Sequence, residues 1–429
     1  MVTSKNMMDI ANRVLPGGSF NSVAFGAASN IIIKSGVGCK ITDISGREYF
    51  DCINGSGPML LGHAHPEVVE AVRKAAECPS NFYVLNDKGI ELAEKLVDAI
   101  PCAEQVKYGV SGSDATFFAM RIARAVTGRS KILKFEGGFL GVNDYALMGM
   151  GPSPDIEAHY PQAVPDSAGI PAVLESEVFV VPFNNIALAR EIIERHGSEI
   201  AAVIVEPQHR CIDPAPGFLE SLRDVTKKAG TLLIFDEVVT GFRLAYGGAQ
   251  QRYGVVPDLA TYGKVVGGGL PLSAVAGSAE LLSRCDPNKA SNPDYCYISS
   301  TMSGHALPAS AGIATLNVLS RDGVYERLYE IGDRFRAGVR EVFRDRGLDV
   351  QLPGTGPLTT VVISKDEVTD YRTSVKGDIN LQKRFLARMV ENGVLTHGKF
   401  YLSLAFSNAD IDHVVHIMDE SLGQVLSHK

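Results

Sequence analysis

The stretch AAVIVEPQHRCIDPAPGFLESLRDVTKKAGTLLIFDE, residues 201–237, decides the fold. It opens with the apolar run 201–205, continues with a helical pattern over 216–228 and closes with the apolar run 232–235. Both apolar runs have the length of a strand, and acidic residues follow each of them. Strands that alternate with helices in this way form a mostly parallel sheet covered by helices. The stretch therefore predicts an α/β fold.

The C-terminal part of the chain predicts a second, smaller domain. Residues 358–363 and 401–406 are typical of strands, while residues 381–391 and the segment from Asp410 onward are typical of helices. This mixture predicts a smaller α+β domain. The predicted boundaries are 1–60 for the N-terminal segment that joins the small domain, 61–318 for the large domain and 319–429 for the C-terminal small domain.

Composition excludes several classes of protein. The chain has 429 residues, of which 45% are hydrophobic and 21% charged, so it is not disordered, collagen-like or coiled-coil. A net charge of −8 gives no support for a nucleic-acid partner, and no segment has the apolar length of a membrane span. Seven cysteines without a Cys-x-x-Cys pair predict reduced thiols, no metal site and a cytoplasmic protein.

Lys264 is the first candidate for chemistry. It lies in the run YGKVVGGGLP, residues 262–271, directly before three glycines and in an otherwise uncharged neighbourhood. A desolvated lysine amine is neutral and nucleophilic near pH 7, which suits a Schiff base. The alternative is an ordinary surface lysine beside a flexible loop.

An acidic residue and a candidate phosphate site accompany this lysine in the sequence. Asp236 follows the predicted strand 232–235, and ligands of open α/β sheets bind beyond the carboxyl ends of strands. A carboxylate there can keep a pyridine nitrogen protonated, although a helix cap is the alternative. Ser111, Gly112 and Ser113 precede a predicted helix over 113–128, where exposed backbone N–H groups can hold a phosphate or merely cap the helix.

Together these residues resemble the class-III, fold type I pyridoxal-phosphate aminotransferases, nearest to the glutamate-1-semialdehyde aminomutase branch. The resemblance covers nearly the whole chain. The motifs that carry it are LPGG (15–18), GPMLLGHAHP (57–66), KFEGGFLG (134–141), VEP (205–207), IFDEVVTGFR (234–243), YGVVPDL (253–259), the Lys264 segment and STMSG (300–304).

The resemblance implies a seven-stranded, mostly parallel sheet and a pyridoxal 5′-phosphate cofactor bound to Lys264 as an aldimine. Lys264 would also move the substrate proton, while Asp236 would pair with the pyridine nitrogen. The remaining cofactor contacts that it implies are Ser111, Gly112 and Ser113 at the phosphate, Phe139 stacked on the ring, Glu206 on the ring side, and Thr301. Gln208, two residues after Glu206, is a further candidate for a cofactor contact. Thr301 matches the threonine that reaches the phosphate of a neighbouring subunit, which implies a homodimer with shared active sites.

Substrate-facing positions depart from the aminomutase pattern. Residues 21–25 lack the arginine of that branch, Ser56 replaces its tryptophan, and residues 396–401 lack its glutamate. Gln208, His209 and Arg210 stand where the family usually has an apolar residue after the Glu-Pro pair. The candidate substrate contacts are Ser56, His209, Arg210 and Lys399, with Arg210 as a possible clamp for a carboxylate or phosphate.

These observations predict an aminotransferase that moves an amino group from a small amine or amino acid to a carbonyl acceptor. The alternative is an intramolecular aminomutase of the glutamate-1-semialdehyde type, because it uses the same chemistry. Racemase, epimerase or decarboxylase chemistry on the same scaffold is a further alternative. A nicotinamide-dependent oxidoreductase would need a glycine fingerprint that the chain lacks.

Overall fold

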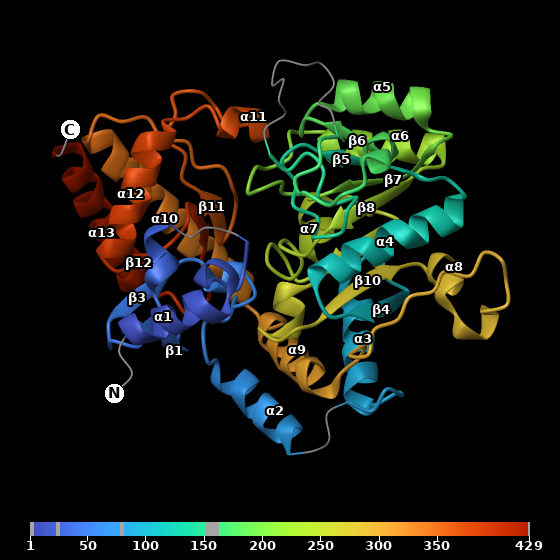
Figure 1. Cartoon of the computed structure of the whole chain (residues 1–429), viewed down its shortest axis with the longest axis horizontal. Helices are drawn as coiled ribbons and strands as arrows, with labels where there is room; N and C mark the ends of the chain where they lie inside the picture. Colours follow the sequence, from blue (N-terminus) through green and yellow to red (C-terminus); the bar gives the residue numbers. More distant parts are fainter. Residues whose placement is uncertain (1–3, 23–25, 78–80, 152–162, 428–429) are drawn as a thin grey trace. The chain divides into compact units, whose positions relative to one another are not determined.

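A seven-stranded sheet forms the centre of the larger of two units, which comprises Glu67–Tyr325 and Val368–Val375. The computed structural model describes residues 4–22, 26–77, 81–151 and 163–427 (Figure 1). In spatial order the strands are β4 (Gln105–Gly109), β10 (Ser273–Gly277), β9 (Leu259–Tyr262), β8 (Leu232–Asp236), β7 (Ile200–Val205), β5 (Lys131–Phe135) and β6 (Val178–Val181). β10 runs antiparallel to both of its neighbours, and all the other pairs run parallel.

The predicted mostly parallel α/β sheet is thus confirmed. Every residue of β7 is buried, because helices cover both faces of a parallel sheet. The helices of this unit are α2 (Pro66–Ala76), α3 (Asp87–Ala99), α4 (Gly112–Thr127), α5 (Ile186–His196), α6 (Phe218–Ala229), α7 (Gly248–Tyr253), α8 (Ala279–Leu282), α9 (Ala306–Leu319) and α11 (Tyr371–Ser374). The helices predicted over 113–128 and 216–228 correspond to α4 and α6.

α4 crosses the sheet over β10, β9, β8 and β7 (Figure 1). A reciprocal capping box starts this helix, since Ser111 accepts from the N–H of Asp114 and the Asp114 carboxylate accepts from the N–H of Ser111. Its apolar face, which includes Phe118 and Ile122, is buried in the core. The start of α4 is therefore fixed relative to the sheet edge.

The glycine run after Lys264 serves helix packing. α9 lies against the 3₁₀ turn η5 (Lys264–Gly267), and a Cβ on Gly268 would come within 2.7 Å of the Ala311 carbonyl oxygen. A Cβ on Gly312 would lie 2.3 Å from the Val266 carbonyl oxygen. These glycines allow the two backbones to touch, so α9 supports the turn that carries Lys264.

The smaller unit comprises Met1–Pro66, Glu326–Glu367 and Lys376–Lys429. It contains a four-stranded sheet, a two-stranded sheet and a core rich in phenylalanine, which gives the predicted α+β character. Its elements are α1 (Ser4–Val14), β1 (Ile33–Val37), β2 (Lys40–Asp43), β3 (Glu48–Asp51), α10 (Val324–Asp345), β11 (Leu358–Thr360), α12 (Ile379–Glu391), β12 (Val394–Leu395), β13 (Lys399–Tyr401) and α13 (Asn408–Ser427).

Both predicted strands of this unit are wrong in their bounds, and the one expected over 358–363 is β11, which ends at Thr360. The strand expected over 401–406 is β13 (Lys399–Tyr401), and the backbone leaves the sheet after Tyr401. The N–H groups of Leu402 and Leu404 donate instead to the carbonyls of Pro357 and Leu60. The segment is apolar because it is buried, and burial alone does not make a strand.

No helix in the described part of the chain is long and apolar enough to cross a membrane. Within the same residues, no group of three or more His, Cys, Asp or Glu side chains could hold a metal ion. The cysteines described are free thiols, namely Cys39, Cys52, Cys102, Cys211, Cys285 and Cys296.

Candidate active site

Four parallel strands deliver polar side chains to one edge of the large sheet. β8 ends at Asp236, Glu206 follows β7, and Lys264 follows β9 by two residues. The loop after β5 begins at Glu136. Carboxyl ends of parallel strands lie at the same edge, which is where open α/β sheets bind ligands.

Asp236 is a buried carboxyl group with hydrogen bonds to one oxygen. Its Oδ1 accepts from Oγ1 of Thr261 at 2.9 Å and from the N–H of Val238 at 3.0 Å. Burial, and then the negative charge of Glu206, raise the pKa of Asp236 to about 7, while the positive charge of Lys264 opposes this shift. The site thus lacks enough positive charge to keep Asp236 fully ionised by itself.

Lys264 is held in an unusual backbone conformation. It opens η5 with a φ of 50°, in the left-handed region that side chains other than glycine rarely adopt. Such strain is retained where the surroundings determine the conformation, and here α9 packs against the same turn. The turn therefore fixes where the lysine leaves the backbone.

The N-terminus of α4 provides an anion site at the same edge. Helix geometry leaves the N–H groups of Gly112 and Ser113 without an intrahelical acceptor. A Cβ on Gly112 would lie 2.8 Å from Cγ1 of Val238, so only glycine fits there without a shift. The helix dipole favours negative charge at this position.

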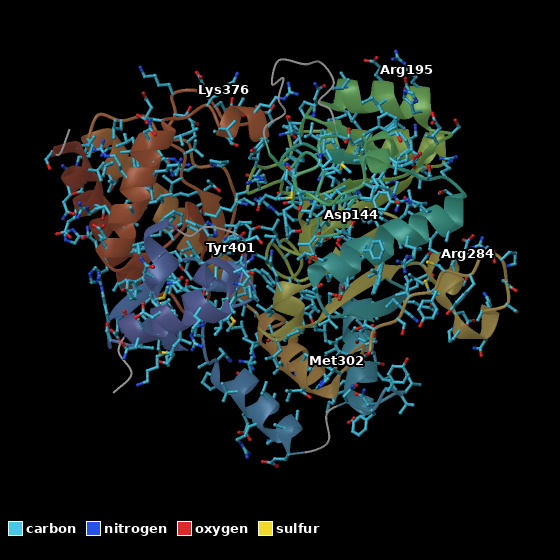
Figure 2. The ribbon with its side chains drawn as sticks, in the orientation of Figure 1. Asp144, Arg195, Arg284, Met302, Lys376 and Tyr401 are labelled. Carbon is cyan, nitrogen blue, oxygen red and sulfur yellow. The ribbon has the colours of Figure 1, made fainter. Side chains whose placement is uncertain are left out.

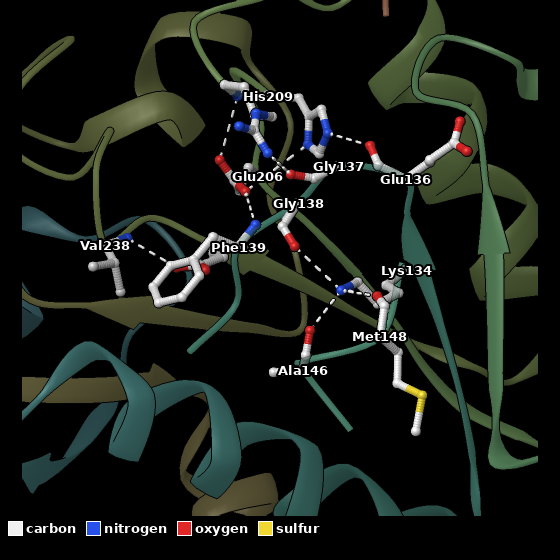
Figure 3. A network of polar contacts seen from close by, with 12 residues as sticks. Lys134, Glu136, Gly137, Gly138, Phe139, Ala146, Met148, Glu206, His209 and Val238 are labelled. Carbon is white, nitrogen blue, oxygen red and sulfur yellow. Dashed lines mark hydrogen bonds and ion pairs between the residues drawn. The ribbon is translucent and has the colours of Figure 1, made fainter. Parts of the chain in front are cut away.

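The loop after β5 brings Phe139 beside Glu206 (Figure 3). The N–H of Phe139 donates to Oε1 of Glu206 at 3.0 Å, and the Phe139 ring is 52% exposed. Further along, the N–H of Val142 donates to Oγ of Ser113 at 3.2 Å. The same loop thus contacts both Glu206 and the start of α4.

Arg210 lies over this loop. Its Nη1 donates to the Gly137 carbonyl, its backbone N–H donates to Oε2 of Glu206 at 3.4 Å, and its guanidinium lies 5.0 Å from the centre of the Tyr371 ring. Tyr371 also packs so closely on Gly137 that a Cβ there would come within 2.4 Å of the ring. Arg210 is therefore held by contacts on two sides, and within the described chain its other guanidinium N–H groups meet no acceptor.

Gln208 and His209 make their contacts with the protein. The Gln208 amide donates to Oδ1 of Asp213 at 2.7 Å. His209 is buried, with Nε2 2.8 Å from the Glu136 carbonyl oxygen and its ring stacked on Phe183 at 4.8 Å.

Three other predicted residues lie on segments outside the network described above. Thr301 is exposed in the turn before α9. Ser56 and Lys399 belong to the smaller unit, where Ser56 is exposed with a φ of 67° and Lys399 begins β13. The segment 21–25 lies partly outside the described residues.

Sequence reasoning missed several residues of this network. Thr261 pairs in register with Asp236, and a threonine at the end of an apolar strand was the available signal. Glu136 and Arg372 form a buried ion pair at 2.7 Å between segments 236 residues apart, which no local pattern reveals. Lys134 is buried among apolar strand residues, and a lysine in such a run was the signal.

The donor set suits pyridoxal 5′-phosphate. The start of α4 offers N–H groups for a phosphate, and Asp236 offers Oδ2 to a protonated ring nitrogen. Lys264 offers an amine of the kind that condenses with an aldehyde. A cation beside Asp236 would also compensate the burial of its carboxylate.

Comparisons with known proteins agree with this assignment. The family aminotransferase class-III matches residues 24–422. The chain is 39% identical to a glutamate-1-semialdehyde 2,1-aminomutase of Syntrophus aciditrophicus, over 98% of this chain and 97% of that protein. It also resembles the crystal structure of an omega-transaminase from Sphaerobacter thermophilus, with a TM-score of 0.93, 32% identity and coverage of 99% and 98%.

A transaminase structure with pyridoxal phosphate bound has a TM-score of 0.89 and 28% identity, and covers 100% of this chain and 99% of its own. These findings confirm the predicted family, fold class and cofactor. The chain belongs to the class-III aminotransferases, which use pyridoxal 5′-phosphate.

Proposed function

We propose that this protein moves an amino group between neighbouring carbons of one small substrate, as an aminomutase. The relatives at 38–39% identity over nearly full length carry the name glutamate-1-semialdehyde 2,1-aminomutase. This observation favours the alternative raised from the sequence over the transaminase that was its main prediction. The geometric support is the convergence of Lys264, Asp236 and the start of α4 at one sheet edge.

The proposed roles follow from the contacts. Bound pyridoxal phosphate supplies an aldehyde that condenses with amines and a ring that accepts the electrons of a broken C–H bond. Lys264 would bind the aldehyde carbon and would act as the base that holds and returns the substrate proton. Asp236 would keep the ring nitrogen protonated, and the N–H groups of Gly112 and Ser113 would hold the phosphate. Phe139 would cover the ring, and Glu206 positions Phe139 by accepting a hydrogen bond from the Phe139 N–H.

An intermolecular transaminase is the second candidate. Three positions of the aminomutase pattern are changed, because residues 21–25 lack arginine, Ser56 replaces tryptophan and residues 396–401 lack glutamate. The similarity to an omega-transaminase at a TM-score of 0.93 supports the same alternative.

One assay separates the two functions. The purified holoenzyme is given glutamate-1-semialdehyde alone, and the product is followed by NMR. An aminomutase forms an isomer of unchanged mass without any acceptor. A transaminase instead needs an added keto acid or aldehyde and releases a deaminated product, which a panel of amine donors and carbonyl acceptors would identify.

Arg210 is the proposed substrate clamp. It is anchored by the Gly137 carbonyl and the Tyr371 ring, and its remaining N–H groups suit a carboxylate in a bidentate pair. We expect Arg210→Met to raise KM for carboxylate-bearing substrates about tenfold or more, since a charge-assisted bond is worth roughly 1.5–3 kcal/mol. KM for an amine without a carboxylate should hardly change, whereas equal losses on both substrates would refute the clamp.

A homodimer is the proposed assembly. Phe82, Tyr83, Val84 and Leu85 form an exposed apolar run before α3, with Leu85 86% exposed. Met302 is also exposed and lies in the turn before α9 (Figure 2). This turn adjoins the run, because Asn86, the residue after Leu85, donates through Nδ2 to the Gly304 carbonyl at 2.8 Å. Apolar surface of this kind is typical of an interface, and a second copy of the chain would cover it. Thr301 in the same turn would then lie at the interface.

We expect Leu85→Glu to convert the protein from twice the 46.0 kDa chain mass to a monomer. A buried carboxylate within the apolar run would oppose association. Sedimentation velocity provides the measurement, and Val173→Glu, at an exposed site of the same unit, is the matched control. A wild-type protein that sediments as a monomer would contradict the proposed dimer.

A further inference from the structure

Lys134 is a buried cation outside the proposed chemistry. It lies in β5, its side chain is inaccessible to solvent, and no described carboxylate lies within ion-pair distance of its ammonium. A buried ammonium is costly unless its three N–H donors find acceptors. A lysine at this buried position therefore needs a specific explanation.

Three backbone carbonyls surround the ammonium (Figure 3). Nζ donates to the carbonyl oxygens of Gly138 at 3.2 Å, Ala146 at 2.6 Å and Met148 at 2.5 Å. All three belong to the loop after β5, so one side chain ties the beginning of this loop to its end. Burial lowers the pKa of Lys134 to about 8, while Asp166 and Glu206 favour the charged form and Arg210 disfavours it.

The tied loop is the one that faces the proposed cofactor. Gly138 directly precedes Phe139, whose N–H donates to Glu206, and Val142 contacts Ser113 at the start of α4. Gly141 lies so close to Ser113 that a Cβ would come within 2.8 Å of its Cα. Displacement of the Gly138 carbonyl would therefore move Phe139, the residue proposed to cover the cofactor ring. Displacement of Gly141 or Val142 would move the contact with Ser113 at the proposed phosphate site.

We propose that Lys134 is a positioning residue that holds the loop 137–148 in the conformation that binds pyridoxal phosphate. This inference rests on the proposed roles of Phe139 and Ser113. Lys134, inside strand β5, would thus raise the affinity for the cofactor without touching it. The effect would act through the three carbonyls that Lys134 holds.

The test compares Lys134→Met with Arg129→Met. Arg129 is a matched control because its Nη1 donates to the carbonyls of Ile200, Ala229 and Gly230, at the start of β7 and before β8. It thus ties three carbonyls in the same way, at the opposite edge of the sheet. Both variants are titrated with pyridoxal phosphate, and hydrogen exchange of the cofactor-free proteins is followed by peptide.

We expect Lys134→Met to weaken cofactor binding about tenfold or more and to speed exchange in peptides covering 137–148. The visible circular dichroism of its bound cofactor should also change, because Phe139 shifts. Arg129→Met should lose thermal stability and keep the wild-type dissociation constant and visible spectrum.

Lys134→Gln keeps two N–H donors without the charge and should bind the cofactor with intermediate affinity, which also tests the idea if the methionine variant fails to fold. Wild-type affinity in the lysine variants would overturn the positioning role. Equal weakening in Arg129→Met would do so as well, since general destabilisation would then explain the loss. Failure of the wild type to bind pyridoxal phosphate would refute the proposed site itself and is distinguishable from both.

Discussion

Lys264→Ala should lower turnover by roughly 10³-fold or more while the fold is kept. The variant loses both the amine that binds the cofactor and the base that moves the proton, and general acid–base catalysis alone contributes about 10²–10⁴-fold. Lys264 has a φ of 50°, and alanine, which also carries a Cβ, should adopt this conformation at a similar cost in strain. Turnover is measured with saturating cofactor, and thermal unfolding of the cofactor-free protein monitors the fold.

Lys289→Ala is the control for Lys264→Ala, because Lys289 is an exposed lysine of the same unit. It should keep wild-type turnover. Turnover in Lys264→Ala within a few-fold of the wild type would show that another group performs the chemistry.

Asp236→Asn should lower turnover and at the same time raise the stability of the cofactor-free protein. Turnover should fall roughly 10²-fold or more, because an amide cannot hold the proton on the ring nitrogen as a carboxylate does. The cofactor-free protein should become more stable at pH 8, since the neutral amide avoids the burial of a negative charge. Turnover and the free energy of unfolding are measured on the same preparations.

The sign of the stability effect follows from the pKa. The pKa of Asp236 is raised from 3.8 to about 7, so the folded state binds this proton more tightly than the unfolded chain does. The free energy of unfolding of the cofactor-free wild type therefore falls as the pH rises from about 4 to about 7. At pH 8 we expect Asp236→Asn to be more stable by roughly 2–4 kcal/mol, with a smaller difference at pH 5. An equal difference at both pH values would contradict a buried, protonated Asp236.

The sequence predicts the large sheet and the edge that carries the candidate active site, because both follow from local patterns of apolar and polar residues. Apolar runs give β7 and β8, and parallel topology then places Glu206 and Asp236 at the same edge. The glycines beside Lys264 were also visible, although one of them, Gly268, serves the packing of α9 rather than a ligand. Residues with a local signal and a fixed strand direction are therefore predictable.

The remaining contacts depend on segments far apart in the chain. Val368–Val375 lies in the region predicted as the C-terminal domain and packs in the larger unit, where Tyr371 meets Gly137 and Arg372 pairs with Glu136. The sequence shows that Lys134 is a lysine within an apolar strand. It does not show which three carbonyls accept hydrogen bonds from this lysine. Such contacts are set by tertiary packing, which no short sequence pattern encodes.

Borohydride reduction followed by peptide mass spectrometry tests the central claim most directly. Reduction makes a covalent bond between the cofactor and a lysine amine irreversible, so the added mass remains on that lysine after proteolysis. The account predicts a single labelled peptide with the reduced pyridoxyl phosphate on Lys264, and no such label in Lys264→Ala. A label on a different lysine, or a reduced holoenzyme without any label, would contradict it.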